Sequence, residues 1–354
     1  MRRLKNWPRP CILRSTDLSR SVQITILGAA ILVALLLVSI VYGTTPISLS
    51  DVLVGISLGL GLTEGEMTLQ HRIVFDLRLT RTLFAAIIGA GLGIVGVILQ
   101  TTTRNDLADP FLFGLSSGAA AGAVFVITIT GDILGFWTLP LAAFCGGLVA
   151  SGIVLALVHG LRTSAPEKLI LSGLAVSFLF SAITNYLIFY GDNRAAHSAI
   201  FWMLGGLGLA RWETFPLVCT GLLLILTYSL YRNRWLDILL TGDQTAITLG
   251  VPVRRLRFLL FFLSALATAV FVSVAGVIGF VGLMVPHISR GIVGPLHRDL
   301  LPTAAIVGAL LLTGSDIISR FLLAPQELPI GIVTTSIGSV FVFLLLIRSR
   351  NAQG

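Results

Sequence analysis

The stretch TLFAAIIGAGLGIVGVILQ, residues 82–100, decides the fold class of this 354-residue chain. It contains no charged residue over 19 positions. A helix rises about 1.5 Å per residue, so this stretch can cross a hydrocarbon core of about 30 Å. Lipid offers no water to backbone polar groups, and a helix satisfies those groups internally. We therefore predict a membrane-spanning helix here.

The same pattern recurs along the chain. Eight further charge-free stretches occupy residues 24–42, 111–131, 133–158, 169–190, 214–231, 258–289, 300–315 and 328–347. Residues 258–289 are too long for one crossing, and Gly276, Gly279, Gly282 and Pro286 favour a break into one full and one short helix. The sequence therefore predicts an all-α, polytopic membrane protein with about ten spans. No long soluble domain interrupts them, so we expect a single membrane domain over residues 1–354.

Composition supports this prediction. Charged residues make up 11% of the chain and hydrophobic residues 55%, and the mean hydropathy is +0.96. Soluble domains carry about 25% charged residues. The net charge of +8 does not indicate a nucleic-acid partner, because the basic residues lie between apolar segments rather than in one patch.

The distribution of basic residues predicts the topology. With the basic N-terminal segment 1–20 in the cytoplasm, 18 of the 24 Lys and Arg residues fall on the inside. Ten spans then leave both termini cytoplasmic in a bacterial inner membrane. The first apolar stretch is too long for the core of a cleaved signal peptide, so we interpret it as the first span.

A polar loop over residues 232–257 carries two short amphipathic patterns. Leu236, Leu239 and Leu240 are spaced for one short helix, and Ala246, Ile247 and Leu249 for another. Breaks are supplied by Gly242 with Asp243, and by Gly250 before Val251 and Pro252. A folded apolar face on the cytoplasmic side indicates a partner protein, with a surface-lying helix pair as the alternative.

Two spans carry stripes of small and polar residues at fourfold spacing. These are Gly173, Ser177, Ser181 and Asn185 in the fifth span, and Gly331, Thr335 and Ser339 in the last. Such a stripe serves either tight helix packing or the wall of a wetted pathway. Asp316 is the one carboxylate within a predicted span, and Arg320 follows it at the spacing of a helical ion pair.

No motif of covalent chemistry is present. The sequence lacks GxxxxGK[ST], HExxH and GxSxG, and its five His and three Cys residues show no ligand spacing. We therefore predict no catalytic residue, no metal site and no cofactor. If the protein uses ATP, another chain hydrolyses it. An ion-coupled secondary transporter is the alternative class, and a channel is a weaker one because no charged ring or filter repeat occurs.

Several blocks, in order, resemble the FecCD-type permeases, the membrane subunits of type II ABC importers for ferric siderophores, haem and cobalamin. The blocks cover residues 78–120, 201–212, 242–251, 279–290 and 327–346. The chain departs from the usual family pattern at Thr80, Asp106, Gln244 and Ser339.

The resemblance implies a transport machine. Similar permeases form a dimer of permease subunits, which works with two copies of a cytoplasmic ATPase and with a periplasmic substrate-binding protein. It assigns binding-protein docking to Arg78, Arg81 and Arg320. It assigns ATPase coupling to Gly242, Asp243, Ala246, Leu249, Gly250 and Val251, and the translocation pathway to the two stripes. A ferric siderophore is the favoured cargo, ahead of haem and cobalamin.

Overall fold

The computed structural model describes residues 15–43, 47–160 and 166–351, and these residues are mostly helical with no β-strand among them. The prediction of an all-α fold is confirmed. The elements are α1 (Ser15–Val41), α2 (Leu49–Gly59), α3 (Leu69–Arg72), η1 (Ile73–Leu79), α4 (Thr80–Thr103), η2 (Pro110–Phe113), α5 (Leu115–Phe125), η3 (Val126–Thr130), η4 (Gly135–Trp137), α6 (Thr138–Gly160), α7 (Pro166–Tyr190), α8 (Asn193–Met203), η5 (Trp212–Thr214), α9 (Phe215–Tyr231), α10 (Asn233–Leu240), α11 (Asp243–Thr248), α12 (Val253–Ala275), α13 (Val281–Val293), α14 (His297–Phe321) and α15 (Ile330–Asn351).

Each of the ten predicted spans corresponds to a helix. Eight described helices are long and apolar enough to cross a membrane. The other two predicted spans correspond to the shorter apolar helices Leu115–Thr130 and Val281–Val293. The chain is therefore a multi-pass membrane protein.

The break in the long stretch 258–289 falls between α12 and α13, as predicted. Gly276 ends α12 at a φ of 65°, a left-handed region that favours glycine. Gly282 and Pro286 lie inside α13 and do not interrupt it. The result is one full helix followed by one short helix.

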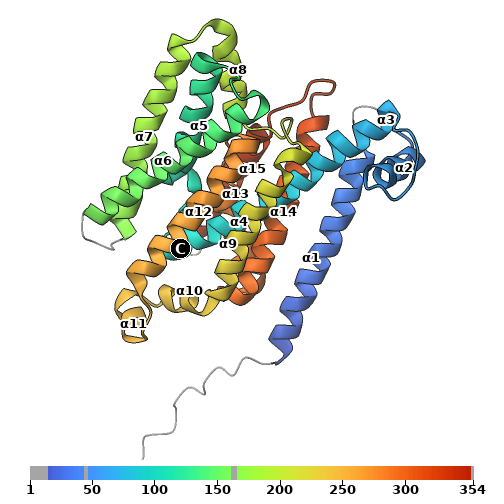
Figure 1. The fold of residues 1–354 in the computed structure, drawn as a ribbon. Coiled ribbons are helices and arrows are strands. Elements are labelled where there is room, and N and C mark those ends of the chain that lie inside the picture. The colour runs from blue at the N-terminus through green and yellow to red at the C-terminus, as the bar shows by residue number, and fades with distance from the viewer. Residues whose placement is uncertain (1–14, 44–46, 161–165, 352–354) are drawn as a thin grey trace, which may run out of the picture.

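Helix α4 lies at the centre of the helical bundle (Figure 1). In the most apolar window of Leu69–Thr103, which contains α4, 83% of the residues are buried. In the corresponding window of Ser21–Val41, in α1, only 11% are buried. Glycines bring α4 close to its neighbours: a Cβ atom at Gly89 would strike the carbonyl oxygen of Gly308 on α14, and one at Gly96 would strike that of Gly282 on α13. Lipid supplies no hydrophobic force between helices, so such close contact is what holds them together.

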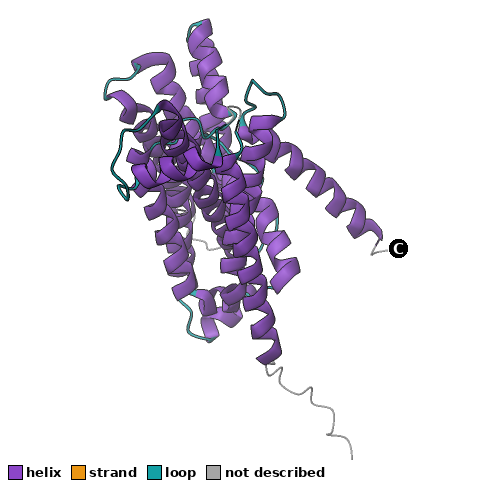
Figure 2. Cartoon of the chain, turned by 90° about the vertical axis from the view of Figure 1, so that its right-hand side faces the viewer, coloured by secondary structure: helices purple, strands orange, loops and turns teal. Residues whose placement is uncertain are grey.

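The two ends of the bundle carry different elements. Helices α10 and α11 lie at the same end as the start of α1, while α2, α3 and α8 lie at the opposite end (Figure 1). Helix α15 projects away from the bundle toward the C-terminus (Figure 2). Its far half exposes large apolar side chains, including Val340, Phe343 and Leu344.

Replacing Gly308 with alanine should destabilise the fold, because the new methyl group would meet the backbone of Gly89 on α4. Overpacking of this kind costs about 1–3 kcal/mol. Gly314 on the same helix is a matched control, since a Cβ there meets nothing within 4 Å. Gly314→Ala should instead gain up to about 1 kcal/mol from helix propensity. Thermal unfolding midpoints in detergent should shift in opposite directions, and equal shifts would contradict this account of the α4–α14 contact.

Candidate functional site

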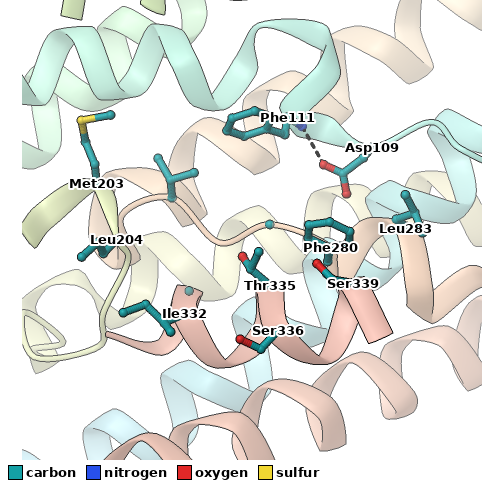
Figure 3. Close-up of a pocket in the computed structure, with 13 residues that line it drawn as sticks. Asp109, Phe111, Met203, Leu204, Phe280, Leu283, Ile332, Thr335, Ser336 and Ser339 are labelled. Carbon is teal, nitrogen blue, oxygen red and sulfur yellow. Dashed lines mark hydrogen bonds between the residues drawn. The ribbon is translucent and has the colours of Figure 1, made fainter. Parts of the chain in front are cut away.

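A pocket of about 700 Å³ opens where four segments meet (Figure 3). These segments are the loop before α5, the end of α8, the break between α12 and α13, and the first turns of α15. The lining residues are Asp109, Phe111, Met203, Leu204, Val277, Gly279, Phe280, Leu283, Gly331, Ile332, Thr335, Ser336 and Ser339. Most of this wall is apolar, and Thr335, Ser336 and Ser339 contribute hydroxyl groups from α15 (Figure 3).

Asp109 is the one acidic residue of the described pocket wall. Its side chain accepts a hydrogen bond from the backbone N–H of Phe111 at 2.9 Å, which fixes the turn that enters α5. Burial raises the pKa of Asp109 to about 6, because a low-dielectric environment disfavours the carboxylate. The lining residues include no Lys or Arg.

The structure places the two predicted stripes differently. Gly331, Thr335 and Ser339 on α15 line the pocket. On α7, Gly173 and Ser177 are buried, and the hydroxyl of Ser177 donates to the carbonyl oxygen of Phe111 at 3.3 Å.

The rest of the α7 stripe lies elsewhere. Ser181 and Asn185 are exposed and do not line the pocket. Within one chain, the α7 stripe therefore borders the pocket at its buried end only.

The predicted loop helices are α10 and α11, and they differ in exposure along their length. Leu236 and Leu239 of α10 are buried, as is Ala246 of α11. Ile247 and Leu249 are 56% and 62% exposed and form the apolar tip of the loop.

The turns around α11 use positive φ values, 110° at Gly242 and 82° at Gly250. Val251 is buried after the second turn. Of the residues assigned to coupling, Ala246 and Val251 thus anchor the loop to the bundle, while Leu249 with Ile247 faces outward.

Ion pairs hold the α11 helix in place. Both carboxylate oxygens of Asp243 accept from Arg257 on α12 at 2.7 Å, and Oδ1 also accepts from Arg104 at 2.9 Å. Bidentate pairs of this kind fix orientation as well as distance. The apolar tip is therefore presented on a rigid support.

At the opposite end, two of the three arginines assigned to docking, Arg81 and Arg320, meet at Asp316. Arg81 donates to Asp316 at 2.7 Å and to Glu327 at 2.6 Å. Arg320 lies 3.1 Å from the other oxygen of Asp316, which confirms the predicted i,i+4 ion pair. Arg78 donates to the carbonyl oxygens of Ile40 and Val41 at the end of α1.

Arg78 and Arg81, three positions apart in the sequence, bind different groups. Residues Ile73–Leu79 form a π-helical segment that runs into α4, so the two arginines reach different partners. Arg78 and Arg320 are buried, while the Arg81 side chain is 15% exposed beside Glu327, whose side chain is 45% exposed.

Several polar contacts of the structure join elements far apart in sequence, and spacing gave no signal of them. Glu327 reaches Arg81, and His297 bridges Asp237 and Thr101. Local spacing could not identify the partners of His297, because Asp237 and Thr101 lie 60 and 196 positions away in the sequence.

Comparisons with known proteins agree on one family. The model of the FecCD transport family matches residues 31–348. The chain is 36% identical to the cobalamin import system permease BtuC of Halobacterium salinarum over 351 residues, which cover 98% of this chain and 91% of that protein. It is 37% identical to the hemin transport system permease HmuU of Yersinia pestis, covering 79% and 85%. It is 36% identical to the Fe(3+) dicitrate permease FecD of Escherichia coli, covering 82% and 90%.

A solved structure shares the fold. An inward-facing metal-chelate type ABC transporter superposes with a TM-score of 0.75 at 29% identity, covering 92% of this chain and 99% of that one. Since the family model spans most of the chain and these relatives align over most of their own length, the chain belongs to the FecCD transport family.

Proposed function

We propose that this chain is the permease subunit of an ATP-driven importer of the inner membrane, with both termini in the cytoplasm. It works with two copies of a cytoplasmic ATPase, a second permease subunit and a periplasmic binding protein. The cargo crosses by alternating access, in which the pocket opens to one side and then to the other. The chain itself performs no covalent chemistry, and ATP is hydrolysed by the ATPase.

The observation that carries this proposal is the rigid apolar tip of the α10–α11 loop. Ile247 and Leu249 are exposed at the end that the basic residues predict to be cytoplasmic. A pair of exposed apolar side chains on a polar loop favours a protein partner rather than water. The clamp of Asp243 by Arg257 keeps the tip from folding back, so a force applied there is passed to α12.

The second permease fits the faces that one chain leaves open. Helix α15 lines the pocket with its polar stripe and exposes apolar side chains farther along. The exposed Ser181 and Asn185 of α7 continue a polar stripe that begins beside the pocket at Ser177. A second subunit against α7 and α15 would complete a pathway lined by Gly173, Ser177, Ser181, Asn185, Gly331, Thr335 and Ser339.

A ferric siderophore is the proposed cargo, and haem and cobalamin are the alternatives. Relatives of the chain are named for cobalamin, hemin and Fe(3+) dicitrate, and the matching structure for a metal chelate. The pocket wall presents hydroxyl groups and no Lys or Arg, which suits a chelate that a separate binding protein has already selected.

An ion-coupled secondary transporter fits the structure less well. Such proteins hold the coupling ion with carboxylates or unwound backbone inside the membrane. Asp316, the fully buried acid of α14, is paired with both Arg81 and Arg320. A carboxylate neutralised by two guanidinium groups is a poor cation site.

Uptake into proteoliposomes tests the proposed function. The complex with its ATPase and binding protein should accumulate a radio-iron-loaded siderophore only when ATP is present on the ATPase side, with proton and sodium gradients collapsed. Radiolabelled haem and cyanocobalamin assayed in parallel identify the cargo. Uptake that follows an ion gradient and ignores ATP would show a secondary transporter instead.

Charge at the loop tip should uncouple transport. We expect Leu249→Asp to weaken ATPase binding by more than tenfold, since an aspartate desolvated at a packed interface costs several kcal/mol, on the order of 2–5. Thr248→Asp is the matched control, because Thr248 is exposed on the same helix and its hydroxyl bonds only to its own helix. The measurement is co-purification of the ATPase with each variant. Equal retention of the ATPase by both variants would show that Leu249 is not part of the contact.

A charged residue at Ala246 would not test the contact, because that side chain is fully buried against the bundle.

Docking of the binding protein is proposed at the opposite end, over Arg78, Arg81 and Arg320. Arg81 is the member of this group that reaches the surface, and Arg78 and Arg320 add positive charge beneath it. Carboxylates on the binding protein would meet this positive region. The half-exposed Glu327 already occupies one nitrogen of Arg81 and therefore competes with them.

Removing that competing charge should speed docking. Glu327→Gln should raise the association rate of the binding protein by about two- to tenfold at low salt, because rim charges act mainly on the rate of encounter. The advantage should fade as salt screens it. Glu66→Gln, an equal charge change on the exposed α2–α3 loop, controls for net charge. An association rate unchanged by Glu327→Gln, or raised equally by both variants, would contradict docking at Arg81.

A further inference from the structure

We propose that the last turn of α4, residues 100–104, is the mechanical connection between the α10–α11 loop and the wall of the pocket. This inference rests on the proposed function, in which a partner acts on that loop. Two sets of contacts bind the turn to the loop, and a third binds it to the first turn of α13. The first set uses Thr101, the second uses Thr102 and Arg104, and the third uses Gln100.

The first connection runs through His297, which is fully buried at the start of α14. Its Nδ1 lies 2.7 Å from Oδ1 of Asp237 on α10, and its backbone N–H donates to the same oxygen at 2.9 Å. A carboxylate only accepts, so Nδ1 carries a proton. Nε2 lies 2.7 Å from the hydroxyl of Thr101. Helix α10 is thereby joined to α4 through one imidazole ring.

The second connection runs through Arg257, which is buried on α12. While its terminal nitrogens grip Asp243 of α11, its Nε donates to the carbonyl oxygen of Thr102 at 3.0 Å. Arg104, the C-cap of α4, reaches the same Asp243. Helix α11 is therefore tied to α4 by a backbone contact and by an ion pair.

The third connection leads from α4 to the pocket. The amide nitrogen of Gln100 donates to the carbonyl oxygens of Gly282 and Leu283, at 3.4 and 3.2 Å. Arg290 on α13 donates to the amide oxygen of Gln100 at 2.7 Å, which fixes the orientation of the amide. Leu283 lines the pocket, so a displacement of Gln100 moves the pocket wall.

Backbone geometry marks both ends of this path. In the described chain, the two non-glycine residues at positive φ are Arg104 at 49° and Phe280 at 67°. Residues other than glycine rarely adopt a positive φ. Those held in this backbone conformation cluster at functional sites and at segments that change conformation. Arg104 ends α4 beside the loop, and Phe280 begins α13 in the pocket wall (Figure 3).

Phe280 also reaches α15. A Cβ atom at Gly338 would strike the Phe280 side chain, so the two are in close contact. A movement of Phe280 at the start of α13 would therefore also displace α15, the helix that carries the polar stripe of the pocket.

A reporter in the pocket tests this connection without knowledge of the cargo. Thr335→Cys is placed in a chain whose Cys11, Cys145 and Cys219 are replaced by serine. The complex with its ATPase, in lipid nanodiscs, is labelled with a charged methanethiosulfonate reagent, with and without ATP and vanadate. Nucleotide should change the labelling rate of the reporter by about fivefold or more, the usual size of coupling between sites.

Thr101→Val and Gln100→Met each break one connection with little change in volume. We expect both to reduce the nucleotide effect on labelling to less than about twofold, while the rate of ATP hydrolysis stays within about twofold of the parent. Thr101→Ser restores the hydroxyl and should restore the effect. Thr103→Val is the matched control, because the Thr103 hydroxyl bonds only to Leu99 within α4.

The outcomes separate this inference from the proposed function. A parent reporter that ignores nucleotide would overturn the proposed function and this inference with it. A responsive parent with equally responsive Thr101→Val and Gln100→Met would overturn the inference alone. Failure of both variants to assemble, with Thr103→Val intact, would also overturn it, because the contacts would then only hold the fold.

Discussion

The close approach of α4 to its neighbours is the constraint on which the rest of the structure depends. At Gly89 and Gly308 the backbones of α4 and α14 meet with no side chain between them, and Gly96 and Gly282 bring α4 equally close to α13. In lipid, dispersion contacts of this kind replace the hydrophobic effect as the source of helix association. Because α4 is held on several sides, its two ends are fixed points at which charged groups can be arranged.

The carboxylates of Asp316 and Asp243, near the two ends of α4, are each paired with arginine side chains, which offsets the free-energy cost of burying their charge. Near the start of α4, the fully buried Asp316 is met by Arg81 and Arg320, and Arg320 also contacts Ser39 of α1. Beyond its other end, Asp243 is met by Arg257 and Arg104. An isolated charge in such surroundings would be strongly unfavourable, whereas a paired and hydrogen-bonded one is tolerated. One helix thus connects a charged cluster on the proposed docking side to another beneath the proposed ATPase contact.

Local patterns in the sequence predicted the local structure well. Stretches without charged residues predicted the membrane spans, and the glycines after residue 275 predicted the break before α13. The spacing of Leu236 and Leu239, and of Ala246 and Ile247, predicted the two short helices α10 and α11. These features depend on residues within a few turns of one another. The i,i+4 pair of Asp316 with Arg320 belongs to the same class.

Other features depend on contacts across the fold and could not be predicted in this way. Fourfold spacing says which residues share a helix face but not what that face meets, so the pocket-lining α15 stripe and the partly exposed α7 stripe were indistinguishable. Arg78, in the π-helical segment before α4, binds the end of α1, whereas Arg81 binds Asp316 and Glu327. The burial of Ala246 and the partners of His297 arise from helices distant in sequence.

We propose above all that the α11 tip receives the ATPase and that a second permease closes the pocket against α7 and α15. A cryo-EM reconstruction of the chain with its ATPase in lipid nanodiscs tests this claim most directly. The account predicts Ile247 and Leu249 seated in the ATPase surface, with protein density from a second permease against Ser181 and Thr335. A reconstruction with the α11 tip in open solvent, or with lipid covering Thr335 and Ser181, would contradict it.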